Sequence, residues 1–222
     1  MTIAKYEIRL CQSCGLRYPL VENHPFGERC PSCLGSTKSI STHRIDQKTA
    51  SLANKSKIRL EALLDNLRSA WNVGSIFRTA DGLGVGKLHL CGITPTPENE
   101  SVTKTSLGAE EAVEWEYARN ALETAQQLKI AGYKLIALEQ GERSTALGDL
   151  PPSKDNATSL WSAQGDMLVL IVGNEITGID PDLLNICDLI LHIPMMGVKR
   201  SLNVEVAFGI AAFQLSREQI LY

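Results

Sequence analysis

The sequence predicts an α/β protein with a mostly parallel sheet and helices on both faces, preceded by a small metal-binding ribbon. Short apolar segments alternate with helical patterns over most of the chain, which is typical of a parallel sheet covered on both sides. Four cysteines in two Cys-x2-Cys pairs stand ahead of these segments. The 222 residues, 44% of them hydrophobic, suffice for one domain of ordinary size and a small appendage.

The cysteine pairs predict one metal site in a unit of residues 1–36. Fifteen residues separate Cys11 and Cys14 from Cys30 and Cys33, a spacing typical of four-thiolate zinc ribbons. Such a short unit has too little core to fold alone, so the metal should supply the folding energy. Zinc is expected, and iron, held by similar cysteine pairs in rubredoxin-like electron carriers, is the alternative.

Disulfides are the other interpretation of these cysteines. The chain starts without an apolar signal core, which favours the cytoplasm, where thiols stay reduced. No apolar run approaches the roughly 20 residues that a membrane helix needs. We therefore expect metal ligands in a cytoplasmic protein with no membrane partner.

Residues 37–56 are rich in Ser, Thr, Lys and Asn and are expected to form a basic polar linker, with the main domain at residues 57–222. Residues 1–60 hold ten Lys or Arg against four Asp or Glu, whereas the rest holds twelve against twenty-one. A basic front end suits contact with RNA phosphates, so residues 1–36 are expected to contact RNA. A solvated face that binds nothing would carry the same charges.

In the main domain, short apolar or alternating segments predict strands at residues 59–65, 87–93, 113–118, 133–138, 167–172 and 189–193. Helical patterns lie between them at residues 72–83, 120–130 and 180–186; Asn72 is expected to be an N-cap, and Asp180 and Pro181 suit the first turn of the third helix. The stretches 94–112 and 139–165 are expected to be long loops, and such loops are often functional.

The last expected helix, at about residues 203–218, carries two apolar stripes. One stripe contains Val204, Ala207, Phe208, Ala211, Ala212 and Leu215, and the other contains Val206, Gly209, Ile210 and Phe213. A helix that is apolar nearly all round is buried on more than one side. In a domain of this size the simplest second partner is another subunit, so we expect a homodimer through this helix.

Three segments carry polar residues at the ends of these elements. The first is residues 65–81, the second residues 172–178 and the third residues 193–207. Taken singly, each has a purely structural interpretation. Asn72 could be only a helix cap, Arg78 only an ion-pair partner of Asp81, and the glycines of the second segment only a tight turn.

Taken together, the three segments resemble, in order and spacing, the three motifs of the SpoU/TrmH family of RNA ribose methyltransferases, over roughly residues 60–220. The resemblance implies a deep C-terminal trefoil knot, a rare exception to the rule against threaded chains. It also implies a homodimer, S-adenosylmethionine bound in the knot, and methyl transfer to a ribose 2′-hydroxyl of tRNA or rRNA.

The resemblance also assigns residues. The positions that match the family's catalytic residues are Asn72, Arg78, Glu175, Ser201 and Asn203, and those that match its cofactor-lining residues are Leu138, Gly173, Ile193 and Leu202. Glu205 stands where many relatives carry a small Ser. A guanidinium has a pKa above roughly 12, so we expect Arg78 to hold the phosphate and the 2′-oxygen rather than to accept a proton.

Two alternatives stay open at this point. One is an RNA-binding protein with a metal ribbon and a catalytically inactive body, and intact site residues argue against it. The other is a rubredoxin-like electron carrier, for which the body offers no visible redox partner.

Overall fold

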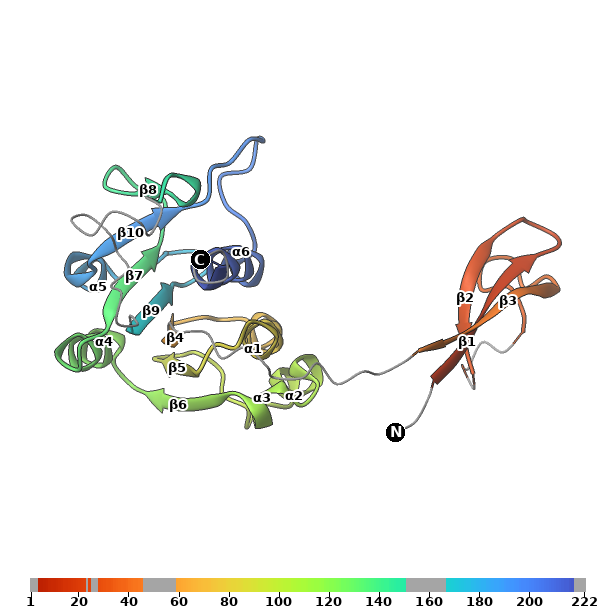
Figure 1. The fold of residues 1–222 in the computed structure, drawn as a ribbon, viewed down its shortest axis with the longest axis horizontal. Helices are drawn as coiled ribbons and strands as arrows, with labels where there is room; N and C mark the ends of the chain where they lie inside the picture. The colour runs from red at the N-terminus through yellow and green to blue at the C-terminus, as the bar shows by residue number, and fades with distance from the viewer. Residues whose placement is uncertain (1–3, 23, 25–27, 46–58, 151–166, 218–222) are drawn as a thin grey trace. The chain divides into compact units, whose positions relative to one another are not determined.

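The computed structural model describes residues 4–22, 24, 28–45, 59–150 and 167–217. It divides the chain into two compact units, Met1–Ala53 and Asn54–Tyr222 (Figure 1). Residues 46–56 of the expected linker and 151–165 of the second expected loop lie outside the described residues.

The N-terminal unit is a three-stranded antiparallel sheet. Its strands are β1 (Ala4–Cys11), β2 (Arg17–Val21) and β3 (Thr37–Ile45), with β1 in the middle. The linker expected from Thr37 onward is therefore wrong for residues 37–45, which pair with β1 along its whole length. The strand reads as polar because most of its side chains are exposed.

The main unit is built on a seven-stranded sheet with the order β6-β5-β4-β9-β7-β10-β8, parallel in every pairing. The strands are β4 (Arg59–Asp65), β5 (Lys87–Cys91), β6 (Glu114–Ala118), β7 (Lys134–Leu138), β8 (Thr145–Ala146), β9 (Met167–Val172) and β10 (Leu189–His192). All six expected strands are confirmed, because buried parallel strands read as short apolar runs. Only the two-residue β8 was not expected.

Helices cover both faces of this sheet, as the sequence predicted (Figure 1). They are α1 (Ala70–Leu83), α2 (Glu100–Ser106), α3 (Ala109–Ala112), α4 (Ala121–Ile130), α5 (Pro181–Ile186) and α6 (Val204–Arg217). One core lies between the sheet and α1 and α6, and the other lies between the sheet and α4 and α5. Phe77 and Phe208 are the largest fully buried side chains of the first core.

Two expectations about local structure are corrected. The stretch 94–112 contains α2 and α3 rather than only loop, and a short 3-10 helix (Leu147–Asp149) follows β8. Helix α1 begins at Ala70, so its N-cap is Ser69 and not Asn72. Among the described residues, no helix is long and apolar enough to cross a bilayer. The C-terminal knot remains a prediction.

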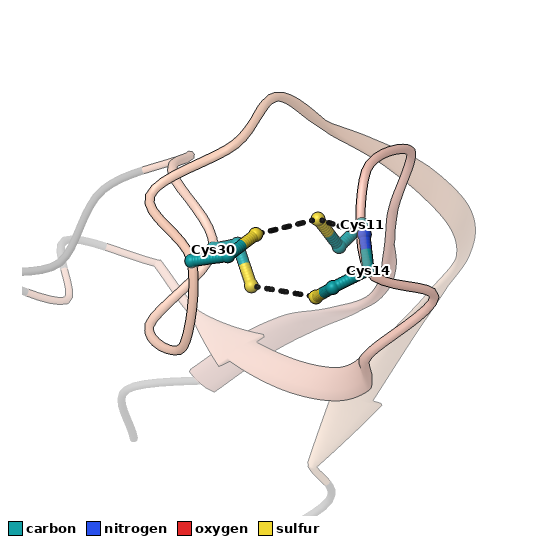
Figure 2. Close-up of side chains that lie close together, drawn as sticks. Cys11, Cys14 and Cys30 are labelled. Atoms are coloured by element: carbon teal, nitrogen blue, oxygen red, sulfur yellow. Dashed lines mark hydrogen bonds between the residues drawn. The ribbon is translucent and has the colours of Figure 1, made fainter.

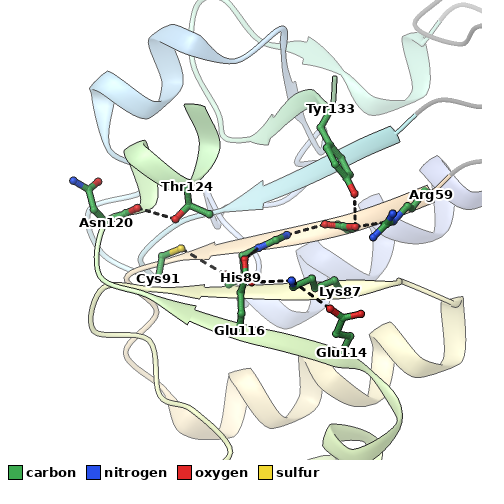
Figure 3. Close-up of polar contacts among 10 residues, drawn as sticks. Arg59, Lys87, His89, Cys91, Glu114, Glu116, Asn120, Thr124 and Tyr133 are labelled. Carbon is green, nitrogen blue, oxygen red and sulfur yellow. Dashed lines mark hydrogen bonds and ion pairs between the residues drawn. The ribbon is translucent and has the colours of Figure 1, made fainter. Parts of the chain in front are cut away.

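A network of charged side chains lies on the sheet near the start of its strands, with Glu61 and His89 buried at its centre (Figure 3). His89 lies between two carboxylates, 2.8 Å from Glu61 and 2.7 Å from Glu116. Glu61, which is 1% exposed, also accepts the Tyr133 hydroxyl at 2.5 Å and pairs with Arg59 at 2.8 Å. Burial acts to raise the pKa of Glu61, but the hydrogen bonds from His89 and Tyr133 outweigh it, so the pKa is lowered.

We expect Glu61→Gln to lower the free energy of unfolding by about 3 kcal/mol at neutral pH, because a neutral amide replaces the charged acceptor of the buried His89 ring and the Tyr133 hydroxyl. Since folding lowers the pKa of Glu61, its stabilising contribution is fully present above the unfolded value of about 4.3. That contribution is lost as the pH falls through the lower folded value. The difference between the two proteins should therefore shrink in acid.

Urea unfolding at neutral pH and at about pH 3, below the unfolded pKa of glutamate, measures this difference. The control is Glu100→Gln, which removes an exposed carboxylate paired with Lys104 at 2.8 Å and should change stability by less than about 1 kcal/mol. An equal loss of stability for both variants would contradict a special role of the buried network.

Candidate functional site

A cleft of about 540 Å³ opens where β7, β9 and β10 end. Such an edge is where parallel α/β sheets bind ligands. Of the residues assigned by resemblance, the ones that line the cleft are Asn72, Leu138, Gly173, Glu175, Ile193, Ser201, Leu202 and Asn203. Asn72 and Asn203, which are 131 positions apart in the chain, therefore line the same cleft. Arg78 does not line the cleft.

The floor of the cleft is a tight turn that follows β9. Asn174 and Gly178 exchange two backbone hydrogen bonds, at 3.1 and 2.9 Å, which fold the chain back on itself. A Cβ on Gly173 would lie 2.4 Å from the backbone nitrogen of Ile179, so this position needs glycine. The glycine lets the backbone of the turn approach closely on one side, and Gly173 also lines the cleft.

Glu175 ties this turn to the start of α1. Its carboxylate accepts the backbone N–H groups of Arg68 at 3.0 Å and Ser69 at 3.2 Å, and the side-chain amide of Asn72 at 3.0 Å. Partial burial acts to raise the pKa of Glu175, yet these donors lower it below the usual value. The group is therefore a carboxylate at neutral pH, placed beside the positive end of a helix dipole.

Asn72 continues the chain of polar contacts to the third segment. Because Ser69 caps α1, the Asn72 side chain is free to reach the cleft, where its oxygen accepts a hydrogen bond from the amide of Asn203 at 3.2 Å. Asn203 in turn accepts the backbone N–H of Glu205 at 2.9 Å, which caps α6. Glu175, Asn72 and Asn203 thus form one hydrogen-bonded row across the cleft.

Arg78 is exposed on α1, two turns after the helix start. Six residues separate it from Asn72, which corresponds to roughly 9 Å along the helix. Within the described ranges its guanidinium makes no hydrogen bond or ion pair, so the expected alternative of a pair with Asp81 does not form. The group is available to a ligand outside the cleft.

Of the polar cleft residues that the sequence interpretation missed, two hold backbone groups in place. Glu139 follows β7, and its carboxylate accepts the backbone N–H groups of Ile179 at 3.1 Å and Gln140 at 3.1 Å. Asn174 holds the turn through its side chain, which donates to the carbonyl of Asn66 at 2.7 Å. Glu139 is the first residue after β7, and Asn174 is the second residue after β9. Ligand sites of parallel sheets lie just beyond the ends of the strands, so this position in the sequence could have indicated both residues.

The four cysteines of the N-terminal unit converge, as Figure 2 shows for Cys11, Cys14 and Cys30. All four sulfurs lie within 4.8 Å of one another, with 3.4 Å between Cys11 and Cys33 and 3.6 Å between Cys14 and Cys30. Zinc–sulfur bonds of about 2.3 Å in a tetrahedron place sulfurs about 3.8 Å apart, so the cluster fits one zinc ion.

The two cysteine loops have the same backbone design. In each, the residue after the second cysteine donates to the carbonyl of the first: Gly15 to Cys11 at 3.1 Å, and Leu34 to Cys30 at 2.9 Å. Both donors have a left-handed backbone. The backbone N–H of Cys14 lowers the pKa of Cys11 to about 6, which favours the thiolate that binds metal.

Comparison with known proteins decides the family. Residues 59–213 match the model of the SpoU rRNA Methylase family, which covers well over half of the chain. The chain belongs to this family. The cleft is therefore described from here on as the SpoU-type cleft.

Two curated relatives illustrate the similarity. A putative TrmH family tRNA/rRNA methyltransferase of Staphylococcus haemolyticus is 30% identical over 78% of this chain, a stretch that spans 65% of that relative. The tRNA (guanosine(18)-2′-O)-methyltransferase of Aquifex aeolicus is 29% identical over 70% of this chain and 67% of its own. The chain thus spans about two thirds of the length of these relatives.

Solved structures agree with the fold. A TrmH/SpoU tRNA modifying enzyme of A. aeolicus superposes with a TM-score of 0.61 and 26% identity, over 74% of this chain and 78% of that one. An rRNA methyltransferase of Sinorhizobium meliloti with bound AdoMet gives 0.63 and 25%, over 74% and 57%. The α/β fold expected from the sequence is confirmed by these SpoU-type structures.

Proposed function

We propose that this protein transfers a methyl group from S-adenosylmethionine to a ribose 2′-hydroxyl of tRNA or rRNA. The observation that carries the proposal is the hydrogen-bonded row of Glu175, Asn72 and Asn203 across the SpoU-type cleft. Support also comes from a relative that methylates the 2′-oxygen of a tRNA guanosine and from the AdoMet-bound neighbour.

The cleft suits S-adenosylmethionine chemically. Its walls combine apolar side chains with exposed backbone at Gly173, and two carboxylates, Glu139 and Glu175, line it. Apolar walls suit the adenine ring, backbone groups suit its polar edge, and a carboxylate suits a positively charged amino group. We assign the cofactor to Leu138, Gly173, Ile193 and Leu202. When bound, it supplies a methyl group on a positively charged sulfur.

The residues of this chain then have to position the acceptor. Methyl transfer is an in-line displacement, so the ribose oxygen must be held against the methyl donor. Arg78, exposed and unpaired within the described ranges, holds the RNA phosphate and the 2′-oxygen with its planar fork of N–H donors. The 2′-proton goes to that phosphate or to a neighbouring group, since a guanidinium does not accept one at neutral pH.

The polar row keeps the acceptor side of the cleft in place. Glu175 fixes the start of α1, on which Arg78 also lies, and Asn72 and Asn203 orient the ribose between α1 and α6. Ser201, which lines the same wall, adds a hydroxyl next to Asn203. We propose that the protein acts in the cytoplasm. The cysteines of a four-thiolate metal site must stay reduced, and the cytoplasm keeps thiols reduced.

Incubation of the protein with methyl-labelled S-adenosylmethionine and total RNA, followed by nucleoside analysis, tests the proposal. We expect label in 2′-O-methylated nucleosides. Label in a methylated base would overturn the ribose assignment. If calorimetry found RNA binding but no binding of S-adenosylmethionine, the inactive RNA-binding alternative would replace the enzyme.

We also propose a homodimer through α6. One stripe of the helix, including Phe208 and Ala211, is buried in its own core. The second stripe stays exposed, with Val206 at 43% and Ile210 at 41%. An exposed apolar helix face of this kind is typical of a subunit interface.

Ile210→Glu should convert the dimer into a folded monomer, because the new carboxylate would be buried without a partner in the dimer but hydrated in the monomer. Analytical ultracentrifugation at micromolar concentration measures the mass. The matched control is Ile130→Glu at the end of α4, where the side chain is 87% exposed, and this variant should stay dimeric. A wild-type protein that sediments as a monomer would rule the interface out.

A further inference from the structure

One face of the N-terminal sheet is left free by the cysteine loops. Residues directly opposite each other in neighbouring strands point to the same side. Arg9 and Thr37 share the side that the cysteine-bearing segment covers, since Arg9 bonds Thr37 at 2.8 Å and pairs with Glu28 at 3.7 Å. The opposite side, called the open face, consists of Tyr6, Ile8, Leu10, Arg17, Pro19, Val21, Lys38, Ser41 and His43.

Within residues 4–22, 24 and 28–45, no part of the N-terminal unit buries the open face. All of its side chains are exposed or half-buried, including the apolar Ile8 and Leu10 in the central strand. On the covered side, by contrast, Arg9 is 6% exposed and Cys11 is 2% exposed. The open face therefore leaves apolar surface available to a ligand.

The described carboxylates of the unit are confined to one side of the sheet. The described part of the unit has three carboxylates, on Glu7, Glu22 and Glu28. None lies on the open face: Glu7 and Glu22 alternate with Tyr6 and Val21, and Glu28 pairs with Arg9. The open face carries two cations, Arg17 and Lys38, both exposed and both opposite Leu10. Its charge is complementary to a polyanion.

An aromatic pair lies at the other end of the open face. The rings of Tyr6 and His43 are stacked, with centroids 5.1 Å apart and planes 23° from parallel. The hydroxyl of Ser41 lies 2.9 Å from Nε2 of His43, which holds the imidazole in this orientation. Because His43 is exposed, the ring face turned away from Tyr6 can stack against a base.

We propose that the open face binds a single-stranded segment of the RNA substrate, with a base stacked on the Tyr6–His43 pair and phosphates held by Arg17 and Lys38. Stacking needs bases that are not already stacked in a helix, which favours a single strand over a duplex. The core of a protein interface is depleted in charge, so a protein partner fits this face less well. The inference rests on the proposed function only in taking RNA as the substrate.

Fluorescence anisotropy with the full-length, zinc-loaded protein tests the face, using an oligouridine of about 10 nucleotides and a duplex of the same length. Tyr6→Ala should weaken binding of the oligouridine about tenfold, whereas Tyr6→Phe, which keeps the ring, should bind like the wild type. Combined Arg17→Ala and Lys38→Ala should lower the slope of log affinity against log salt by about 1.4. The duplex should bind more weakly than the single strand.

The matched control combines Lys5→Ala with Arg44→Ala, which removes two exposed cations from the opposite side of the same sheet. This variant should keep the salt slope. Equal losses in both double variants, or no effect of Tyr6→Ala, would overturn the assignment to the open face. Retained zinc shows that each variant is folded. Calorimetry with S-adenosylmethionine tests the methyltransferase separately, so a failure of one proposal is distinguishable from a failure of the other.

Discussion

Arg78→Ala is expected to reduce methyl transfer by at least about 100-fold while leaving the affinity for S-adenosylmethionine unchanged. Arg78 is exposed on α1 and does not line the cleft, so its removal alters no wall of the cofactor site. What the variant loses is the group that we propose to hold the RNA phosphate and the 2′-oxygen. Calorimetry with the cofactor and single-turnover transfer to RNA measure the two effects independently.

Two further variants distinguish a loss of methyl transfer from a loss of cofactor binding. Arg78→Lys keeps the charge but lacks the planar fork that holds two oxygens, so it should restore little activity. Leu202→Trp should do the reverse and weaken cofactor binding first, because Leu202 lines the cleft. A variant Arg78→Ala that loses the cofactor but binds RNA normally would show that these roles are assigned the wrong way round.

The double variant Cys30→Ser and Cys33→Ser is expected to lose the metal and to unfold the N-terminal unit alone. Two of four ligands are removed, and metal binding contributes about 10–16 kcal/mol in comparable small zinc units. The main unit has its own two cores and should keep its thermal transition. Elemental analysis, together with limited proteolysis, measures both outcomes.

Cys187→Ala is the control, because this thiol lies in the main unit, where it donates to the carbonyl of Leu183 at 3.2 Å. The control should keep one metal ion per chain. Zinc is expected in the wild type, and a visible iron–thiolate absorption would assign iron instead. Metal-free wild-type protein with disulfides in its mass spectrum would exclude the metal site.

The main sheet could be predicted closely because β4, β5, β7 and β9 are buried on both faces. Segments such as Leu168–Val172 are apolar without interruption, and nearly every side chain in them is buried. The polar strand β3 was mistaken for a linker, because a small sheet with exposed side chains has no apolar signature. Helix α2 was missed for a similar reason: Val102 is its one apolar side chain, so the helix has no apolar stripe.

The candidate site was predictable as a set of residues, but its connections were not. The three segments pointed to Asn72, Glu175 and Asn203, and the fold places all of them on one cleft. Which residue caps α1 depended on where the helix begins, and Ser69 fits that position better than Asn72 once Ala70 is helical. Glu139 was missed because one acid after a strand is a weak signal without knowledge of the strand order.

The bond from Glu175 to the start of α1 makes two backbone amides indirect reporters of the turn that follows β9. The N–H groups of Arg68 and Ser69 have their hydrogen-bond acceptor 107 and 106 positions away in the chain. They exchange with solvent deuterium when the Glu175 carboxylate moves away, even if α1 itself stays intact. Their exchange rates therefore record the opening of a loop to which they do not belong, and a ligand that closes the loop slows both.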